Sequence, residues 1–459
     1  MSNPTATSLR TYARDRIMGW RPTIRHAAPQ PGEALPPGPR TLGALQSMRV
    51  WGARNTYFPA MQQRYGDTFL LRVTPIGQIV VVCGLEDVRK VALGGPDLFP
   101  IGENNSMFEA LIGKRTVLSL DGAEHRAERK RIMPAFHGER IAAVVTAMEE
   151  LTAQEVMRWP IGSDFSLVER MQELALRVIV RVVLGVEDRA RAEALAPALR
   201  RMVDYSNLEL LMLVWPQLAR LGPWRKAIAG LDHADDLLCA EIDRRRADPD
   251  RHQRADVLSM LLDGDPDDEL VRVELVTLLA GGQETSAMAA SWMFERLLRH
   301  PGALARVRAG LDDPKDEYRT AVINETLRVR PVVYNVGRRA TAPVELGGYR
   351  VPAGTFVWAS LAAIHRDPRI WGEDVEEFRP ERWLEPDVPS RAFLPWGGGA
   401  HRCLGATFAH IEMEVILRTV LRHVELRADQ AADEPMVMRN IFALPKHGAR
   451  VRVERRLGG

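Results

Sequence analysis

A cysteine that follows a run of glycines is the feature of this sequence with the clearest chemical potential. Residues 396–405 read WGGGAHRCLG, and apolar residues at helical spacing follow over about 404–422. Consecutive glycines let the backbone adopt positive φ and approach a flat partner closely. A sulfur at a helix N-terminus faces free N–H groups and the positive end of the helix dipole, and both favour the thiolate. Cys403 is therefore a candidate thiolate ligand for a metal.

A buried structural cysteine beside a glycine turn is the alternative interpretation of this segment. The chain has three cysteines, without CxxC spacing, which argues against a disulfide framework or a structural zinc site. Cys83 ends an apolar run and Cys239 lies in a helical stretch, so we expect both to be small buried residues. The pattern G-x-H-x-C-x-G is expected by chance in roughly 4 of 10,000 sequences of this composition, so coincidence explains Cys403 poorly.

A long predicted helix carries a second group of reactive side chains. Asp267-Asp268-Glu269 places carboxylates at its start, and apolar periodicity continues to about Arg299. Two glycines in its middle, Gly281 and Gly282, each cost about 1 kcal/mol relative to alanine. They indicate close approach of a ligand or a local opening of the helix, or else close packing of a neighbouring helix. Glu284-Thr285 follows, an acid and a hydroxyl that can relay protons, although Thr285 can equally bond its own backbone.

Two pairs at helical spacing complete the candidate set. Glu325 and Arg328 lie one turn apart, a weak signal that usually marks a solvated pair worth a few tenths of a kcal/mol. Their position between the long helix and the cysteine segment gives them more weight, and residues 378–383 read FRPERW. His125 and Arg129, four residues apart, share one helix face within 121–137.

Taken together, these motifs resemble those of the cytochrome P-450 family, and the resemblance covers about residues 35–455. The family's cysteine loop reads F-x-x-G-x-H/R-x-C-x-G, and this chain departs from it only at Trp396, where phenylalanine is usual. Residues 281–286 match the family pattern [AG]-G-x-[DE]-T-[ST]. The family's E-x-x-R and P-E-R-[FW] motifs follow in the same order as here.

The resemblance implies haem b (iron protoporphyrin IX) as cofactor, with Cys403 as axial ligand and metal-binding residue. A thiolate on haem iron favours O–O cleavage. Glu284 and Thr285 would then be catalytic, while Glu325, Arg328 and Arg382 would brace the cysteine loop. Trp396 could donate its N–H towards the sulfur and shift the redox potential. The implied cofactor-binding residues, including the partners of the haem propionates, are His125, Arg129, Arg338, His401, Cys403, Trp396 and Gly282.

The segments that line the family's substrate pocket are nearly all apolar here, with Asn104, Asn105, Tyr334 and Asn335 as polar anchors. An apolar cavity with few polar groups suits a fatty acid, a terpenoid or a steroid-like compound, although ordinary core packing has the same composition. The run 208–214 could instead touch a membrane surface. The pocket residues we select are Met107, Phe108, Leu279, Gly281, Val333 and Phe442.

The expected partner is an electron donor of the ferredoxin or flavodoxin type with its NAD(P)H reductase, since no flavin or iron–sulfur segment is fused to the chain. A basic patch would attract such an acidic protein, although each of these residues could be an ordinary solvated charge, Arg131 as readily as not. The patch comprises Arg126, Lys130, Arg131 and Arg402.

Composition excludes other classes. The net charge is +2 and 46% of residues are hydrophobic, so we expect no nucleic-acid partner. Residues 1–30 contain no apolar h-region, and the chain has no run of about 18 apolar residues. We therefore expect no transmembrane anchor and a cytoplasmic location.

The fold class we predict is mainly α with a minor β region, the cytochrome P-450 fold with a long central helix over the haem. Residues 67–73 and 78–82 read as strands, and shorter strands return at 333–340, 344–351 and 354–358 before an extended tail at 436–454. Residues 1–40 form an irregular arm with a proline-rich hinge, and 41–459 a single catalytic domain. Further helices are predicted at 139–158, 166–184, 190–205, 224–246 and 301–310.

The predicted function is that of a haem-thiolate monooxygenase, which inserts one oxygen atom from O2 into a hydrophobic substrate by hydroxylation or epoxidation. Two alternatives stay open. One is a haem-thiolate peroxygenase or isomerase, against which the Glu284-Thr285 pair argues. The other is a non-catalytic haem sensor.

Overall fold

The fold is built from two compact units, each described here by itself. The computed structural model describes residues 34–458 except 75, 103–108, 110–111, 114, 137–139, 204–208, 210–215, 265 and 430–431. Among these, one unit comprises Ile101–Ala147 and Leu176–Gln283, and the other comprises 34–100, Met148–Ala175 and 284–458. The division into an arm over 1–40 and one domain over 41–459 stays a prediction.

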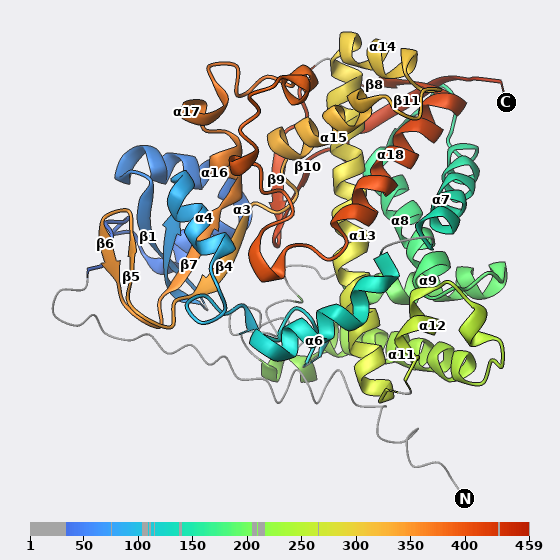
Figure 1. The fold of residues 1–459 in the computed structure, drawn as a ribbon, viewed down its shortest axis with the longest axis horizontal. Coiled ribbons are helices and arrows are strands. Elements are labelled where there is room, and N and C mark those ends of the chain that lie inside the picture. Colours follow the sequence, from blue (N-terminus) through green and yellow to red (C-terminus); the bar gives the residue numbers. More distant parts are fainter. Residues whose placement is uncertain are drawn as a thin grey trace, which may run out of the picture. The chain divides into compact units, whose positions relative to one another are not determined.

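The second unit contains a four-stranded sheet of order β1-β2-β7-β4 (Figure 1). Its strands are β1 (Thr68–Val73), β2 (Gly77–Val82), β7 (Phe356–Ser360) and β4 (Asn335–Arg339). Only β2 and β7 pair in parallel; the other two pairings are antiparallel. Apolar side chains of β1, β2 and β7 share a buried cluster with α4 (Leu85–Leu93), and this burial fixes α4 on the sheet.

Several smaller strands fall where the sequence predicts short or extended pieces, whereas the strands at 164–166 and 424–428 lie outside every predicted strand. Residues 344–351 form the hairpin of β5 (Val344–Leu346) and β6 (Tyr349–Val351), with Gly347 and Gly348 at positive φ in the turn. The tail 436–454 provides two strands of one hairpin and the central strand of a three-stranded sheet. These remaining strands are β9 (Met436–Arg439), β10 (Phe442–Pro445), β11 (Arg450–Arg456), β3 (Asp164–Ser166) and β8 (Val424–Ala428).

The longest helix, α13 (Asp268–Arg299), begins at the predicted acidic start and contributes residues to both units (Figure 1). Helices α7 and α8 do the same. The helices of the second unit include α15 (Glu317–Val329) and α18 (Ala406–His423), which position the candidate site. The other described helices are α3 (Gly43–Tyr65), α6 (Gly122–Ile132), α7 (Arg140–Val156), α8 (Leu167–Val182), α9 (Arg189–Val203), α11 (Gly222–Arg246), α12 (Val257–Leu261), α14 (Pro301–Ala309), α16 (Leu361–His365) and α17 (Pro368–Trp371).

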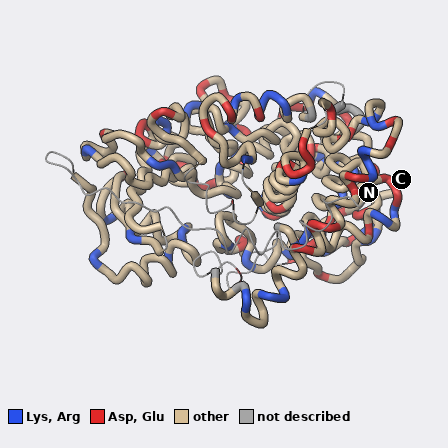
Figure 2. The backbone as a smooth tube through the Cα atoms, turned by 90° about the horizontal axis from the view of Figure 1, so that it is seen from below, with Lys and Arg blue, Asp and Glu red and all other residues tan. Residues whose placement is uncertain are grey.

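Short 3₁₀ turns connect several of these helices. They are η1 (Met133–Phe136), η2 (Pro216–Arg220), η3 (Arg251–Gln253), η4 (Pro380–Leu384), η5 (Ser390–Ala392) and η6 (Gly399–His401). In the described part of the chain, no helix combines the length and apolarity that crossing a bilayer requires. Figure 2 shows blue and red segments scattered along a mainly tan tube, in line with the nearly balanced charge.

Candidate functional site

The cysteine segment forms a closed loop. The backbone N–H of Cys403 donates to the carbonyl of Trp396 at 2.8 Å, which ties the two ends of the loop together. Gly397 and Gly399 have φ of +66° and +65°, where a side chain would be strained. A Cβ on Gly398 would lie 2.1 Å from Leu93, so the loop packs directly against the end of α4. Gly398 is therefore required for close packing, and Gly397 and Gly399 for the backbone conformation.

The helix after the loop begins later than the sequence indicates. We predict it over about 404–422, whereas α18 begins at Ala406 with Gly405 as its N-cap. Cys403 therefore lies in the loop, two residues before the N-cap. The backbone of this loop, and not a helical turn, therefore positions the sulfur.

The three cysteines differ in a way that separates a ligand from core residues. Cys403 is exposed, whereas Cys83 is buried and Cys239 is intermediate. Desolvation raises the pKa of Cys83 strongly and the pKa of Cys239 to about 11, so both stay protonated thiols at neutral pH. Cys403 is the cysteine whose sulfur an incoming iron can reach, and its surroundings fit a haem-thiolate ligand.

A second predicted cofactor residue contacts the same end of α4. Arg338, buried on β4, donates from Nη2 to the carbonyl of Ala92 at 3.3 Å, next to the Leu93 that meets the loop. The structure thus brings Arg338 and the cysteine loop to consecutive residues of one helix end. A buried guanidinium at this place fits the propionate role that the resemblance implies, and His401 lies in η6 of the loop itself.

His125 and Arg129 lie on α6 in the other unit. Burial, followed by the positive charge of Arg129, lowers the pKa of His125 below its ordinary value. Its imidazole is then neutral at neutral pH, so it would serve a carboxylate as a hydrogen-bond donor, not as a second cation. Of the basic patch, Arg126 and Lys130 are exposed on α6 and Arg402 on the loop, whereas Arg131 is half-buried and pairs with Glu128.

The acid of α13 is held from two sides. Gln172 of α8 donates from Nε2 to both carboxylate oxygens of Glu284, at 2.8 and 3.1 Å. Arg439 of β9 lies 3.4 Å from the same carboxylate. Glu284 is 9% exposed, and the side chain of Arg439 is 40% exposed, so this cation connects a nearly buried acid to solvent. No sequence motif indicates either Gln172 or Arg439 as a partner of Glu284.

The glycines of α13 have different surroundings. A Cβ on Gly282 would lie 3.4 Å from Ile179 of α8, an ordinary packing contact. A Cβ on Gly281 meets no heavy atom within 4 Å among the described residues, and Gly281 is exposed although most of the helix is buried. The helix runs through both positions as one element. Within the described part of the chain, no heavy atom occupies the position of a side chain at Gly281, three residues before Glu284, as close approach of a ligand requires.

The next residue of α13 links this helix to α18. Ser286 hydrogen bonds to Glu412, which lies on α18 nine residues after Cys403. Burial raises the pKa of Glu412 to about 7, and the bond from Ser286 opposes that rise. The helix that bears Glu284 and the helix that follows the cysteine loop are thereby joined through a polar contact.

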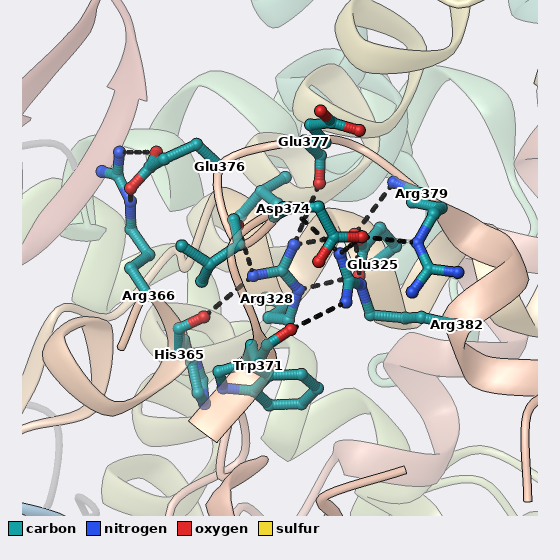
Figure 3. Close-up of polar contacts among 12 residues, drawn as sticks. Glu325, Arg328, His365, Arg366, Trp371, Asp374, Glu376, Glu377, Arg379 and Arg382 are labelled. Atoms are coloured by element: carbon teal, nitrogen blue, oxygen red, sulfur yellow. Dashed lines mark hydrogen bonds and ion pairs between the residues drawn. The ribbon is translucent and has the colours of Figure 1, made fainter. Parts of the chain in front are cut away.

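Glu325, Arg328 and Arg382 form one buried ion cluster (Figure 3). Arg328 donates from Nε and Nη2 to both oxygens of Glu325 at 2.8 Å, and Arg382 donates from Nε at 3.1 Å. Both pairs form between side chains that are at most 5% exposed. Such pairs require full hydrogen bonding to offset their desolvation.

The remaining donors of the cluster hold the chain that leads to the cysteine loop (Figure 3). The carbonyl acceptors of Arg328 and Arg382 belong to His365, Val375, Glu377, Trp371 and Asp374. The indole N–H of Trp383 donates a further hydrogen bond to the carboxylate of Glu325 at 2.9 Å.

His365 connects this segment to the start of the cysteine loop. Its Nε2 accepts a hydrogen bond from the backbone of Leu394 at 3.0 Å. Burial, followed by the charge of Arg328, lowers the pKa of His365 to about 3, so the imidazole is neutral and can accept this bond. The cluster therefore acts on the loop through His365, a residue that motif reasoning missed.

The candidate pocket residues are placed in part. Met107 and Phe108 lie outside the described residues. Val333 and Phe442 form an antiparallel bridge, and Leu279 is buried on α13. The indole of Trp292, farther along α13, donates to the carbonyl of Ala443 at 3.0 Å. The strand that carries Phe442 is thus fixed to the second half of α13.

Two of the proposed polar anchors have other partners. The hydroxyl of Tyr334 donates to the carbonyl of Asn55 at 3.2 Å, and Asn335 accepts from Arg54 at 2.8 Å. Both bonds attach this segment to α3. Asn104 and Asn105 lie outside the described residues.

Comparison with known proteins agrees with this arrangement. Residues 34–453 match the family described as Cytochrome P450. The chain is 38% identical over 431 residues to cytochrome P450 135B1 of Mycobacterium tuberculosis, with 91% of each chain covered. It is 34% identical to cytochrome P450 138 of the same organism, with 94% of this chain and 99% of the other covered.

A solved structure shares the fold. A cyanobacterial CYP120A1 with retinoic acid bound has a TM-score of 0.78 at 21% identity, with 93% of this chain and all of the other covered. With a family match over nearly its whole length, this chain belongs to the cytochrome P450 family. That family consists of oxidoreductases whose cofactor is haem with a cysteine thiolate ligand, so the predicted recognition, fold class and cofactor are confirmed.

Proposed function

We propose that this chain is a haem-thiolate monooxygenase in which Cys403 binds the iron and Glu284 and Thr285 deliver protons. The observation that carries the proposal is the Glu284-Thr285 pair, which lies on α13 three residues after Gly281, where no described residue occupies the position of a side chain. When bound, the haem supplies the iron at which dioxygen is reduced. The protein's part is to hold the cofactor, exclude bulk water and move protons.

Proton movement can be assigned to named atoms. The carboxylate of Glu284 accepts from Gln172 and faces Arg439, whose side chain is 40% exposed. A proton from solvent can therefore reach this carboxylate when the long 3.4 Å contact to Arg439 opens. Thr285 supplies a half-buried hydroxyl next along the helix. Reductive cleavage of O2 consumes two protons, and an acid followed by a hydroxyl provides a path for them.

The other predicted site residues are proposed for cofactor binding. Arg338, His401, His125 and Arg129 serve the propionates, Gly282 and Trp396 border the cofactor, and the cluster around Glu325 holds the loop. Electrons come from a ferredoxin or flavodoxin-type protein with its NAD(P)H reductase, attracted by Arg126, Lys130 and Arg402.

The substrate we propose is an apolar molecule of the fatty acid, terpenoid or steroid class. The side chains of Leu279, Val333 and Phe442 are apolar, and the polar groups of Tyr334 and Asn335 are bonded elsewhere. The CYP120A1 structure contains retinoic acid, a terpenoid acid, which makes it a suitable first probe.

The proposal is tested by titration and turnover of the purified holoprotein. Retinoic acid, a saturated fatty acid and a steroid are titrated against the ferric protein, and we expect at least one to change the haem spectrum. That compound is then incubated with ferredoxin, reductase, NADPH and isotopically labelled dioxygen. We expect one labelled oxygen atom in the product. Product formed only with added peroxide would favour a peroxygenase, an unlabelled rearranged product an isomerase, and no product a sensor; each contradicts the proposal.

A further inference from the structure

An exposed apolar ridge lies at the beginning of α3. The ridge consists of Leu42, Leu45 and Met48, which are 75%, 49% and 70% exposed. Their spacing of three residues places them on one side of the helix start. The other exposed large apolar side chains of the described residues occur singly or in a pair at widely separated places. Scattered exposed apolar residues need no explanation, whereas a contiguous group indicates an interaction surface.

Hydrogen bonds on the opposite side of the start of α3 determine which way the ridge faces. Gln46 is buried; its Nε2 donates to the carbonyl of Thr41 at 2.8 Å and its Oε1 accepts from the backbone of Arg72 at 2.8 Å. Ser47 accepts from the backbone of Thr74 at 2.8 Å. These bonds attach α3 to the edge strand β1 and to the residue that follows it. The ridge consequently faces away from the sheet and has no route to bury itself by rotating the helix.

The sequence around the ridge is strongly basic. Residues 34–85 contain five arginines and one acid, Asp67, in a chain whose totals are 62 basic and 60 acidic residues. Arg369 and Gln62 bind Asp67, so its charge is already matched. The exposed arginines of this region are Arg40, Arg49, Arg64 and Arg72.

Three of these arginines line one groove beside the ridge. The groove has a volume of about 580 Å³, and no acidic residue lines it among the described residues. Arg72 is held in place because its Nη1 donates to the carbonyl of Pro39 at 3.2 Å, and its Cβ lies 3.6 Å from the position of a Cβ on Gly43. The groove and the ridge are therefore neighbours. The groove is lined by Pro36, Pro37, Gly38, Arg40, Arg64, Tyr65, Leu70 and Arg72.

Charge selects the occupant of this surface. Residues 1–33 of the same chain carry five arginines against Asp15 and Glu33, and a second copy would present the same arginines. The arginines of the groove would therefore repel both residues 1–33 and a second copy of the chain. The partner that matches both the ridge and the groove has an apolar interior beneath a dense layer of negative charge. That description fits an anionic phospholipid bilayer, in which acyl chains lie beneath a layer of phosphates.

We propose that the ridge and the arginine groove form a docking surface for anionic membranes, with the three apolar side chains inserted among the lipids and the arginines at the phosphates. Contact of this kind is peripheral and reversible, since it depends on shallow burial and on screened charge. It would hold the enzyme where apolar compounds dissolve.

The test uses the holoprotein and large unilamellar vesicles in a sedimentation assay. One vesicle is phosphatidylcholine alone, and the other is equimolar phosphatidylcholine and phosphatidylglycerol. We expect the protein to sediment with the anionic vesicles at low ionic strength and to be released by salt. Absence of binding to the anionic vesicles, or equal binding to both kinds, overturns the proposal.

Two sets of substitutions separate the two parts of the surface. Each set should weaken binding at least about tenfold. Loss of the arginines removes about fivefold per basic residue from the partition coefficient, and loss of the ridge removes the apolar area that inserts among the lipids. The first set removes the ridge and the second reverses the groove. The sets are Leu42→Ser with Leu45→Ser and Met48→Ser, and Arg40→Glu with Arg64→Glu and Arg72→Glu.

Matched controls make equal changes elsewhere on the exposed surface and should bind as the wild type does. The spectrum of each variant's reduced carbon monoxide complex reports intact haem ligation, so a loss of docking is distinguished from a loss of the enzyme. Docking variants that bind like the wild type contradict the proposal, as does a ridge variant that changes only the oligomeric state, which would identify a second copy as the occupant. The controls are Ile161→Ser with Leu221→Ser and Leu384→Ser, and Arg189→Glu with Arg391→Glu and Arg427→Glu.

Discussion

Replacement of Glu284 by glutamine is expected to lower the rate of product formation by about 100-fold, with the haem spectrum unchanged. Glutamine has nearly the same shape and can keep a hydrogen bond to Gln172, so the fold of α13 is preserved. It cannot take up and release protons, and Arg439 loses the charge 3.4 Å away. The loss should therefore appear in proton delivery, measured as a larger solvent isotope effect on turnover and as NADPH consumed without product.

The matched control is the same substitution at Glu269, in the first turn of the same helix. Glu269 pairs with Arg272 at 3.1 Å and its side chain is 36% exposed. We expect Glu269→Gln to leave turnover and coupling unchanged. If Glu284→Gln keeps product formation within twofold of the wild type, the assignment of Glu284 to proton delivery is wrong.

The largest effect on stability is expected from Glu325→Gln, which should lower the free energy of unfolding by about 3–5 kcal/mol. The carboxylate of Glu325 is fully buried and accepts from Arg328, Arg382, Trp383 and the backbone of Arg379. Glutamine leaves the buried guanidinium of Arg328 without its carboxylate partner, and Arg382 keeps only its 3.3 Å pair with Asp374. Because the same cluster reaches the cysteine loop through His365, retention of haem should fall with stability.

Chemical denaturation, followed by far-UV circular dichroism and by haem absorbance, measures both consequences. The control is Glu193→Gln, which breaks a pair with Arg189 whose side chains are 61% and 79% exposed. An exposed pair of this kind contributes at most about 1 kcal/mol. If Glu325→Gln does not fold, the milder Arg328→Lys, which keeps the charge and loses the bidentate geometry, should fold but be less stable than Glu193→Gln. Equal stability of Glu325→Gln and Glu193→Gln contradicts the account.

Local pattern predicted the elements with strong signals. The start of α13 follows from its run of carboxylates, and β1 and β2 follow from β-branched residues on either side of a turn. Helix α3 was missed, because Pro59 lies inside it, it has no acid in its first turn, and it kinks at Ala53 (φ −145°, ψ 34°). Its first apolar residues are exposed, so they give no core-facing stripe. Helices are recognised in a sequence by apolar residues that face the core, and the start of α3 lacks this pattern.

The site divides in the same way. Motif spacing identifies Glu325, Arg328 and Arg382, but the backbone carbonyls that complete their bonds have no signature in side-chain identity. Gln172 lies 112 residues from Glu284 in sequence, and only the packing of α8 on α13 brings them together. Arg131 could equally belong to a docking patch or be an ordinary solvated charge, and the structure pairs it with Glu128, three residues earlier on the same helix. Contacts between residues that are far apart in the sequence could not be predicted from local patterns.

The ligation of iron by Cys403 is tested most directly by the absorption spectrum of the reduced, carbon monoxide-treated protein. We predict the red-shifted band of a thiolate-ligated haem in the wild type, its retention in Cys83→Ser and Cys239→Ser, and its loss in Cys403→Ser. A wild-type spectrum without the red-shifted band, or a Cys403→Ser variant that keeps it, would contradict the account.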